Sequence, residues 1–397
     1  MSHYTAVADT CVTCHMGSDD NHNYEPNVTT CKGCHTTATD FDINGVQSTT
    51  QTRLDELGAL LVGLGVLSSN DVDGHPTVSQ APENAGKALW NWLYIAHEDK
   101  SLGVHNPGYT EALLDDSFAA LGSPFEAKWA DLGGAPGNAA DAQYHPTNGG
   151  LYKDYDNGRL IWNYDTNTVY WVYGAILIKY DQLGGMTGDL GLPVSDEMDV
   201  SGVTGARVSN FTGGRIYWSP GVGTYAMTNQ EIIAKYDAPP VGTGPEYFGL
   251  PTSDVYAAWD GYAQNMQMAI LTTNATLNAH YVRGGVMVKY QMMGGPTGAL
   301  HLIVSEEQAL SGVPGAPEAV YAVLQNGRVY WSLTTGSRVV NGGIYTMYME
   351  VGGPAGLLGL PITDEYPIAL PGGAARSAFQ HGFITWWSLY GTWMDVM

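Results

Sequence analysis

The sequence predicts a multidomain protein of two unlike parts: a small, mostly α-helical domain at residues 1–124, then a β-rich module of repeated units with short helices at residues 125–397. All four cysteines lie within the first 34 residues. Leucines and aromatic residues recur at helical spacing in the first part, whereas three short phrases repeat about every 54 residues in the second. A chain of 397 residues is long enough to form a core in each part.

The composition excludes several classes of protein. Apolar residues make up 44% of the chain and charged residues only 14%, which is typical of a folded protein. The chain has 16 Lys and Arg residues against 39 Asp and Glu residues, and the resulting formal charge of −23 repels nucleic acids and anionic membrane surfaces. No run of about 18 apolar residues is present. We therefore expect neither a nucleic-acid partner nor a membrane span.

The spacing of the cysteines indicates their chemistry. Two cysteines separated by two residues and followed by a histidine occur twice, in Cys11-Val-Thr-Cys14-His15 and in Cys31-Lys-Gly-Cys34-His35. In a C-x-x-C-H motif the two thiols form thioethers with the vinyl groups of a c-type haem, and the histidine binds the iron from one face. We predict two covalent haem c groups, with His15 and His35 as the proximal iron ligands.

Two other uses of the cysteines are weaker. A structural zinc site has the right ligand types, but the two pairs are only 20 residues apart, and the histidine after each pair would be unexplained. A redox-active C-x-x-C disulfide normally opens a helix within a β-α-β unit, and that pattern is missing from the sequence around these cysteines.

A six-coordinate haem iron needs a second axial ligand, and the first 110 residues contain more spare histidines than two haems require. His22 lies nine residues before Cys31, so a short loop can carry it from one haem to the other. His105 lies between Gly103 and Pro107, which predict a break between two helical stretches. The other spare histidines are His3, His75 and His97.

These features make residues 1–122 similar to the C-terminal portion of bacterial multihaem c-type cytochromes. The shared features are the tandem C-x-x-C-H motifs, the His-Asn-Tyr-x-Pro stretch that begins at His22, and the segment 101–109 before an apolar helix. The Gly-Val-His-Asn-Pro stretch around His105 resembles one in pentahaem nitrite reductases and their electron-transfer relatives. The resemblance implies two bis-histidine haems with His22 and His105 as distal ligands. We keep His3 and His97 as alternative distal or intersubunit ligands.

Three helices are expected around the haems, at residues 51–67, 83–97 and 109–121, because apolar residues recur there at helical spacing. Thr110 is a suitable N-cap for the third helix. The aromatic residues of these segments are expected to pack against the haems and the helices.

Three phrases define five repeated units of about 54 residues in the second part. The first is an aromatic residue after Lys or Met, in most copies shortly before Gly-Gly, and it begins at Lys128, Lys179, Lys235, Lys289 and Met347. The second is Leu-Gly-Leu-Pro or a variant that runs on into Ser/Thr-Asp, and it ends at Pro193, Pro251 and Pro361. The third is Gly-Arg-x-Tyr-Trp-Ser at Gly214 and Gly327, with looser copies at Gly158 and Gly382.

The phrases resemble the LGFP repeat, found at the C-termini of mycolyltransferases and other surface proteins of Gram-positive bacteria. The resemblance implies a closed module of five units with pseudo-fivefold symmetry that binds the cell wall. Each unit is expected to contain a short helix, a Pro-terminated loop and one or two strands, and neighbouring units must stack to bury both faces. The third unit departs most, because Leu300-His301-Leu302-Ile303 replaces the second phrase and the third phrase is missing around residues 265–271. We expect this unit to have lost that strand.

The repeated tryptophans and arginines have two interpretations each. The tryptophans either stack on sugar rings or fill the cores of the repeats, and we favour the core because a repeated position is first of all a packing position. They are Trp162, Trp218, Trp331 and Trp386. The arginines either bind anionic sugars or pair with the Asp of Ser-Asp, and we favour pairing. They are Arg159, Arg215 and Arg328.

Together, the motifs favour an extracellular or cell-surface electron-transfer protein without catalytic residues, whose repeats dock to cell-wall polysaccharide or to a protein. The expected redox partners are other haem proteins or copies of itself, with His3 as a ligand across subunits. The alternatives are a haem enzyme of nitrite or hydroxylamine type, which needs an open iron site, and a surface adhesin with structural haems. Residues 1–4 show no export signal, although haem c attachment takes place outside the cytoplasm, so we expect a mature form or part of a longer protein.

Overall fold

The computed structural model describes residues 7–16, 24–71, 73–140, 144–147 and 149–397. The chain divides into two compact units, residues 1–196 and residues 197–397. The first unit therefore contains the helices and the first repeat, and the boundary expected after residue 124 falls inside a helix. No helix of the described residues is long and apolar enough to cross a membrane.

Helices form most of the first 131 residues, and all three predicted helices are present with different ends. They are α2 (Thr10–His15), α3 (Val28–Cys31), η1 (Ile43–Gly45), α4 (Val46–Gly63), α5 (Glu83–Leu93), the π-helix η2 (Tyr94–Asp99) and α6 (Pro107–Asp131). The expected N-cap Thr110 is wrong, because Asn106 caps α6 by accepting a hydrogen bond from the Tyr109 N–H at 3.3 Å. Pro107 then occupies the first turn, where its missing N–H costs nothing.

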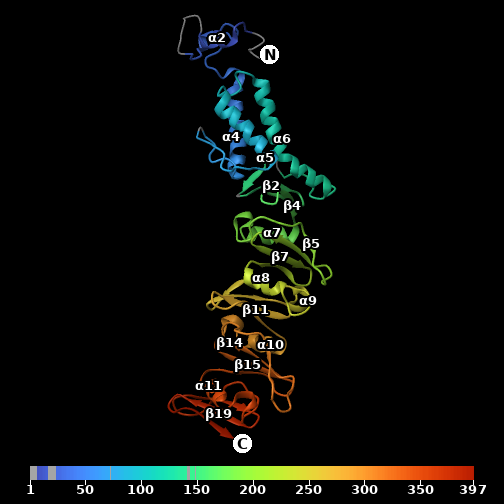
Figure 1. The fold of residues 1–397 in the computed structure, drawn as a ribbon, viewed down its shortest axis with the longest axis vertical. Coiled ribbons are helices and arrows are strands. Elements are labelled where there is room, and N and C mark those ends of the chain that lie inside the picture. Colours follow the sequence, from blue (N-terminus) through green and yellow to red (C-terminus); the bar gives the residue numbers. More distant parts are fainter. Residues whose placement is uncertain (1–6, 17–23, 72, 141–143, 148) are drawn as a thin grey trace. The chain divides into compact units, whose positions relative to one another are not determined.

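One core joins the helices to the first sheet. Helices α4, α5 and α6 pack against one another, and α6 continues onto strands of the first repeat (Figure 1). The buried core runs from Leu57 of α4 and Trp92 of α5 to Phe125 of α6 and Trp162 of the sheet. The Phe125 and Trp162 rings lie edge to face with their centroids 6.4 Å apart. The first repeat thus shares its core with the helical part.

Each of the five units forms its own antiparallel sheet of four strands. The strands are β1 (His145–Thr147), β2 (Gly150–Tyr155), β3 (Gly158–Asn163), β4 (Thr168–Val172), β5 (Met198–Asp199), β6 (Arg207–Phe211), β7 (Gly214–Ser219), β8 (Gly223–Met227), β9 (Tyr256–Ala258), β10 (Gly261–Asn265), β11 (Ala269–Asn274), β12 (His280–Arg283), β13 (Gln308–Ala309), β14 (Val320–Leu324), β15 (Gly327–Ser332), β16 (Gly336–Val340), β17 (Tyr366–Ile368), β18 (Ala374–Phe379), β19 (Gly382–Trp387) and β20 (Gly391–Val396). Within each sheet, sequence neighbours pair, and the described sheets share no strand, so none closes into a barrel.

Short helices follow the sheets and explain why two of the phrases recur. These helices are α7 (Gly174–Gln182), α8 (Gln230–Asp237), α9 (Gly244–Phe248), α10 (Gly284–Met292) and α11 (Gly342–Glu350), with 3₁₀ turns η3 (Gly185–Thr187), η4 (Gly295–Thr297) and η5 (Gly353–Ala355). The Tyr of the first phrase is buried, and its hydroxyl donates a hydrogen bond to the backbone carbonyl of the second residue of the second phrase. Tyr236 reaches the Gly249 carbonyl at 2.9 Å, and Tyr348 reaches the Gly359 carbonyl at 2.7 Å.

The third unit keeps the strand that we expected it to lack. Strand β11 aligns with the Gly-Arg-x-Tyr-Trp-Ser strand of the other units, and Ile270 stands where they have Arg. All six residues of β11 are buried. The prediction was wrong because burial on both faces, and not the aromatic phrase, defines this strand.

The third unit also contains an unusual turn. His301 stands where the other units have the glycine of the second phrase, and its backbone is left-handed, with φ 58°. The equivalent residues Gly249 and Gly359 have φ of 76° and 66°. Its ring stacks on that of Trp259, which is also left-handed, with centroids 3.5 Å apart and planes 11° apart. A side chain in this backbone region costs about 1–2 kcal/mol, which the stacking partly offsets.

Candidate functional site

The structure brings together one histidine of the first C-x-x-C-H motif and one predicted distal ligand. His15 ends α2, and His105 lies in the loop between η2 and α6. The centroids of their rings are 6.3 Å apart, and the ring planes are tilted by 43°. These two residues lie 90 positions apart in the sequence, so the tertiary fold alone creates the pair.

Each ring of the pair is oriented by a hydrogen bond at Nδ1. His15 Nδ1 lies 2.8 Å from the Tyr24 carbonyl oxygen, and His105 Nδ1 lies 2.9 Å from Asp99 Oδ1. A carbonyl only accepts, so Nδ1 of His15 carries the proton and Nε2 keeps its lone pair. Neither Nε2 has a hydrogen-bond partner among the described residues. Two such nitrogens are suited to bind a metal.

An irregular segment places His105. The π-helix η2 ends α5, and Lys100 and Leu102 follow it with left-handed φ of 51° and 50°. The Ser101 hydroxyl accepts the His105 N–H at 3.2 Å and lies 2.5 Å from Asp99 Oδ2. π-Helical turns and strained backbone are concentrated at functional sites.

Asp99 remains ionised in this setting. Burial alone would raise the pKa of its carboxyl, but the hydrogen bonds from Ser101 and His105 and the charge of His105 outweigh burial and lower the pKa. An ionised Asp99 accepts the Nδ1 proton of His105 and increases the electron density on the imidazole.

The four cysteines are free thiols that lie near one another. Cys14 and Cys31 are half-buried, and Cys11 and Cys34 are exposed. Burial raises the pKa of Cys14, and the negative charge of the other three thiolates raises it further. No group of three or more His, Cys, Asp or Glu side chains with the geometry of a metal site exists among the described residues.

The other predicted iron ligands are placed as follows. His22 and His3 lie outside the described residues. His35 follows α3, and its backbone N–H donates to the Cys31 carbonyl at 2.8 Å. His97 lies in η2 with its ring centroid 5.5 Å from that of Trp92, and its buried Nε2 has no hydrogen-bond partner in the described chain.

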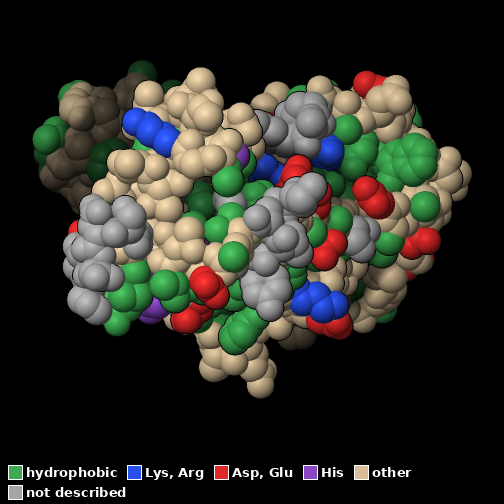
Figure 2. All heavy atoms as spheres, turned by 90° about the horizontal axis from the view of Figure 1, so that it is seen from above, with side chains coloured by type: hydrophobic (Ala, Val, Ile, Leu, Met, Phe, Trp, Pro, Cys, Tyr) green, Lys and Arg blue, Asp and Glu red, His purple; other side chains and the backbone are tan. Residues whose placement is uncertain are grey.

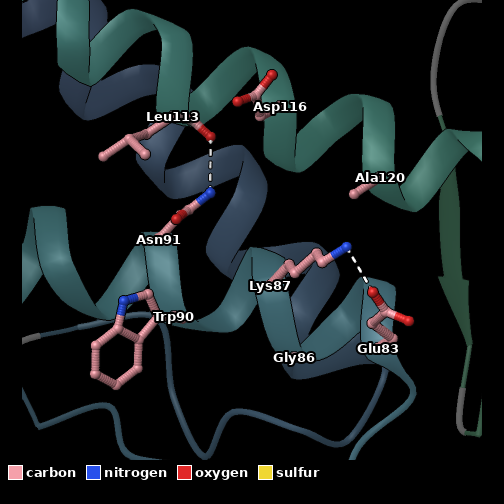
Figure 3. A pocket seen from close by; sticks show the side chains of 8 residues that line it. All are labelled: Glu83, Gly86, Lys87, Trp90, Asn91, Leu113, Asp116 and Ala120. Atoms are coloured by element: carbon pink, nitrogen blue, oxygen red, sulfur yellow. Dashed lines mark hydrogen bonds and ion pairs between the residues drawn. The ribbon is translucent and has the colours of Figure 1, made fainter.

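A groove of about 580 Å³ lies between α5 and α6 (Figure 3). Along α5, Lys87 and Glu83 form an ion pair at 2.7 Å, and Asn91 reaches across to the Leu113 carbonyl of α6 at 3.2 Å. Trp90, which lies at the edge of this groove, is 72% exposed. Since no histidine or cysteine lines the groove, it contributes no iron ligand.

Negative charge is concentrated in the helical part. Residues 1–125 contain 4 Lys and Arg against 16 Asp and Glu, whereas residues 126–397 contain 12 against 23. On the face shown in Figure 2, acidic side chains lie among only a few basic ones. This field attracts cationic partners and repels anionic ones.

The arginines of the third phrase do not pair with the Asp of Ser-Asp, so that prediction was wrong. Arg159 pairs with Asp154 and Asp181 at 2.6 and 2.7 Å, and Arg215 pairs with Asp237 at 2.6 Å. The Asp of Ser-Asp has other partners. Asp196 binds Lys128 at 2.5 Å, and Asp364 binds Lys289 at 2.7 Å.

The repeated tryptophans differ in exposure. Trp162 is buried in the core, as favoured. Trp218 and Trp331 are half-buried, and Trp386 is 39% exposed. Trp331 packs so closely on Gly285 that a Cβ there would lie 2.3 Å from the ring, which explains one glycine of the repeat.

Four segments of the chain match the LGFP repeat, a repeat associated with the cell surface or the cell wall: residues 138–188, 190–244, 310–356 and 358–394. The third unit lies in the gap between the second and third matches, although it folds as a four-stranded sheet like the others. A sequence comparison with curated proteins found no match.

Several solved structures show low similarity. A streptogramin B lyase is 9% identical with a TM-score of 0.11, over 63% of this chain and 65% of the lyase. A virginiamycin B lyase from Staphylococcus aureus is 8% identical with a TM-score of 0.12, over 62% and 66%. PorZ, a surface component of the type-IX secretion system of Porphyromonas gingivalis, is 6% identical with a TM-score of 0.13, over 64% and 26%. The chain covers less than two thirds of each of these proteins.

Proposed function

We propose that this protein is an extracellular electron carrier with two covalent haem c groups, and that its LGFP repeats dock it to cell-wall polysaccharide or to a surface protein. The observation that carries the proposal is the pairing of His15 with His105. Metal–imidazole bonds of about 2 Å on opposite sides of one iron leave two ring centroids about 6 Å apart. The ring centroids of His15 and His105 are 6.3 Å apart, which supports the proposal that both rings bind one iron.

The chain's own residues would hold one haem as follows. Cys11 and Cys14 would form the thioethers, and His15 and His105 would bind the iron through Nε2. The Tyr24 carbonyl and the Asp99 carboxylate fix the two rings through Nδ1. When bound, such a haem supplies a one-electron couple.

The second haem would be held by Cys31, Cys34 and His35, with His22 as its distal ligand. Burial is the main cause of the raised pKa of Cys14, and the further contributions of Cys31, Cys11 and Cys34 place the four thiols near one another, which supports two closely spaced groups. Short separation favours electron exchange between them. Two haems span little distance, so we also propose that copies of the chain or other haem proteins extend the path, with His3 or His97 as candidate ligands between subunits.

Haem content and ligation test this proposal. The full chain, produced in a host that attaches haem c, should give a pyridine haemochrome spectrum equivalent to two haems per chain and a low-spin ferric spectrum. His105→Ala should convert one haem to the high-spin form and leave the haem count unchanged. His75→Ala is the matched control, since this exposed histidine bonds only Ser68 and Asp73. A chain that binds zinc and no haem would contradict the proposal, and a high-spin wild type would favour the haem-enzyme alternative.

A further inference from the structure

Arg328 is the repeat arginine whose expected acidic partners are both missing. It is the second residue of β15, the position that Arg159 and Arg215 occupy in β3 and β7. Arg159 faces Asp154 across the hairpin and Asp181 on the following helix. At the corresponding positions Arg328 has Val323 across the hairpin and Met349 on α11.

The surroundings of Arg328 leave its charge uncompensated. The guanidinium carbon lies 5.0 Å from the centroid of the Tyr321 ring and 5.2 Å from that of Tyr345. Nη1 lies 3.9 Å from Met349 Sδ, which is a weak acceptor, and the guanidinium also donates to the neutral Tyr330 hydroxyl, so neither contact supplies a negative charge. Nε is buried without a hydrogen-bond partner, and Arg328 has no ion pair among the described residues.

We propose that Arg328, with Tyr321 and Tyr345, forms a binding site for an oxyanion of a surface polysaccharide, either the carboxylate of a uronic acid or a phosphate. A guanidinium stays charged and presents a planar fork of N–H donors, which matches carboxylate and phosphate oxygens two at a time. The faces of the Tyr321 and Tyr345 rings hold the fork in place. The substitution of Asp by Met at position 349 opens this fork to a ligand.

The inference rests on the docking role proposed for the repeats, and it is independent of the haems. Loss of the anion site would therefore leave haem content and spectrum unchanged, whereas failure of haem attachment would leave anion binding unchanged.

The test is calorimetric titration of the full chain at low salt with a galacturonic acid oligosaccharide, with glycerol phosphate, and with a neutral galactose oligosaccharide. We expect one site per chain for an anion and no binding of the neutral sugar. Binding of the uronate alone or of the phosphate alone identifies the source of the oxyanion.

Reciprocal variants locate the site. Met349→Asp should create the ion pair that the first two units have and weaken binding by about tenfold or more, as should Arg328→Gln. Asp237→Met should release Arg215 and add a second site. Asp181→Met is the matched control and should add none, because Arg159 keeps Asp154.

Two results would overturn the inference: a wild-type chain that binds neither anion, or binding that stays unchanged in both Met349→Asp and Arg328→Gln. Circular dichroism shows whether each variant is folded. If Arg328→Gln fails to fold, Met349→Asp decides alone, since it adds an ion pair to an otherwise intact unit.

Discussion

At the scale of single residues, Asp99 is the side chain that orients His105, one of the two iron ligands of the proposed haem site. Its carboxylate accepts the Nδ1 proton of His105, and electron density passed to the imidazole stabilises ferric iron. We predict that Asp99→Asn raises the reduction potential of one of the two haems. A spectroscopic redox titration measures this, with Asp116→Asn, an exposed carboxylate of α6, as the control. Identical potentials in Asp99→Asn and the wild type would refute the role of Asp99.

The lowered pKa of Asp99 also makes the stability of the folded chain depend on pH. A carboxyl with a depressed folded-state pKa contributes stability above its unfolded pKa of about 3.9, and this contribution is lost as the pH falls through the folded value. The bond to His105 therefore persists at neutral pH and is lost only in strongly acidic solution.

His301 allows a second residue-scale prediction. Glycine adopts a left-handed backbone freely, whereas alanine pays its cost without the ring that stacks on Trp259. His301→Gly should be more stable to urea unfolding than His301→Ala by about 1 kcal/mol. Equal stability of the two variants would mean that the backbone at position 301 relaxes.

The sequence indicated His15 through the C-x-x-C-H motif, and it indicated His105 through the resemblance of the Gly-Val-His-Asn-Pro stretch to multihaem cytochromes. Their pairing could not be predicted from the residues. It depends on a π-helix and on left-handed Lys100 and Leu102, and neither has a signature in local composition.

At the scale of elements, the Asp of Ser-Asp ties a helix to a sheet. Asp364 accepts from Lys289 of α10 at 2.7 Å and from the Val339 N–H of β16 at 2.9 Å. Asp196 does the same with Lys128 of α6 and the Trp171 N–H of β4. Both phrases recur because they meet at this contact, which the spacing of the phrases alone did not reveal.

Asp364→Ala should therefore destabilise the protein by about 1–3 kcal/mol, because it leaves the Val339 N–H and the half-buried Lys289 without an acceptor. Urea denaturation measures the loss. Asp395→Ala removes an exposed carboxylate from β20 and is expected to change stability little. A loss as large in the control would show that the effect is not specific to the helix–sheet contact.

The prediction that the repeat arginines pair with the Asp of Ser-Asp was wrong for a geometric reason. Arg159 and Arg215 are the second residues of their strands, next to the hairpin, where the C-terminal turn of the following helix supplies Asp181 and Asp237. Arg159 has Asp154 across the hairpin as well. Five repeated units were predictable because they recur in sequence, and all five sheets are present.

At the scale of the whole molecule, the buried tyrosines predict that the folded protein loses stability in alkaline solution. Burial raises the pKa of Tyr155 to about 12, and it does the same for Tyr330, although Arg328 opposes it there. Tyr236 and Tyr348 are raised further. A raised folded-state pKa means that stability is complete below the unfolded value of about 10 and falls as the pH rises above it.

We expect the free energy of unfolding to fall steadily above about pH 10, where unfolded tyrosines ionise and buried ones do not. Urea titrations at neutral and alkaline pH, followed by circular dichroism, measure this decline. Tyr348→Phe should reduce the slope at some cost in stability at neutral pH, because it also removes the bond to the Gly359 carbonyl. A flat pH profile would contradict the burial of these hydroxyls.

The predicted closure of the five units into a ring stays a prediction. Small-angle X-ray scattering tests it, because a ring and an open row of five sheets differ in radius of gyration.

Helix α6 carries a mechanical consequence. Its first turn follows His105 directly, and its last turns hold Phe125 in the core of the first sheet and Lys128 against Asp196. If the repeats are anchored to a wall, a pulling force on them acts on α6, as well as on the contact of α4 with the first sheet, and reaches the loop that contains His105. Under the proposed function, tension on the repeats would thereby act on the backbone that positions His105.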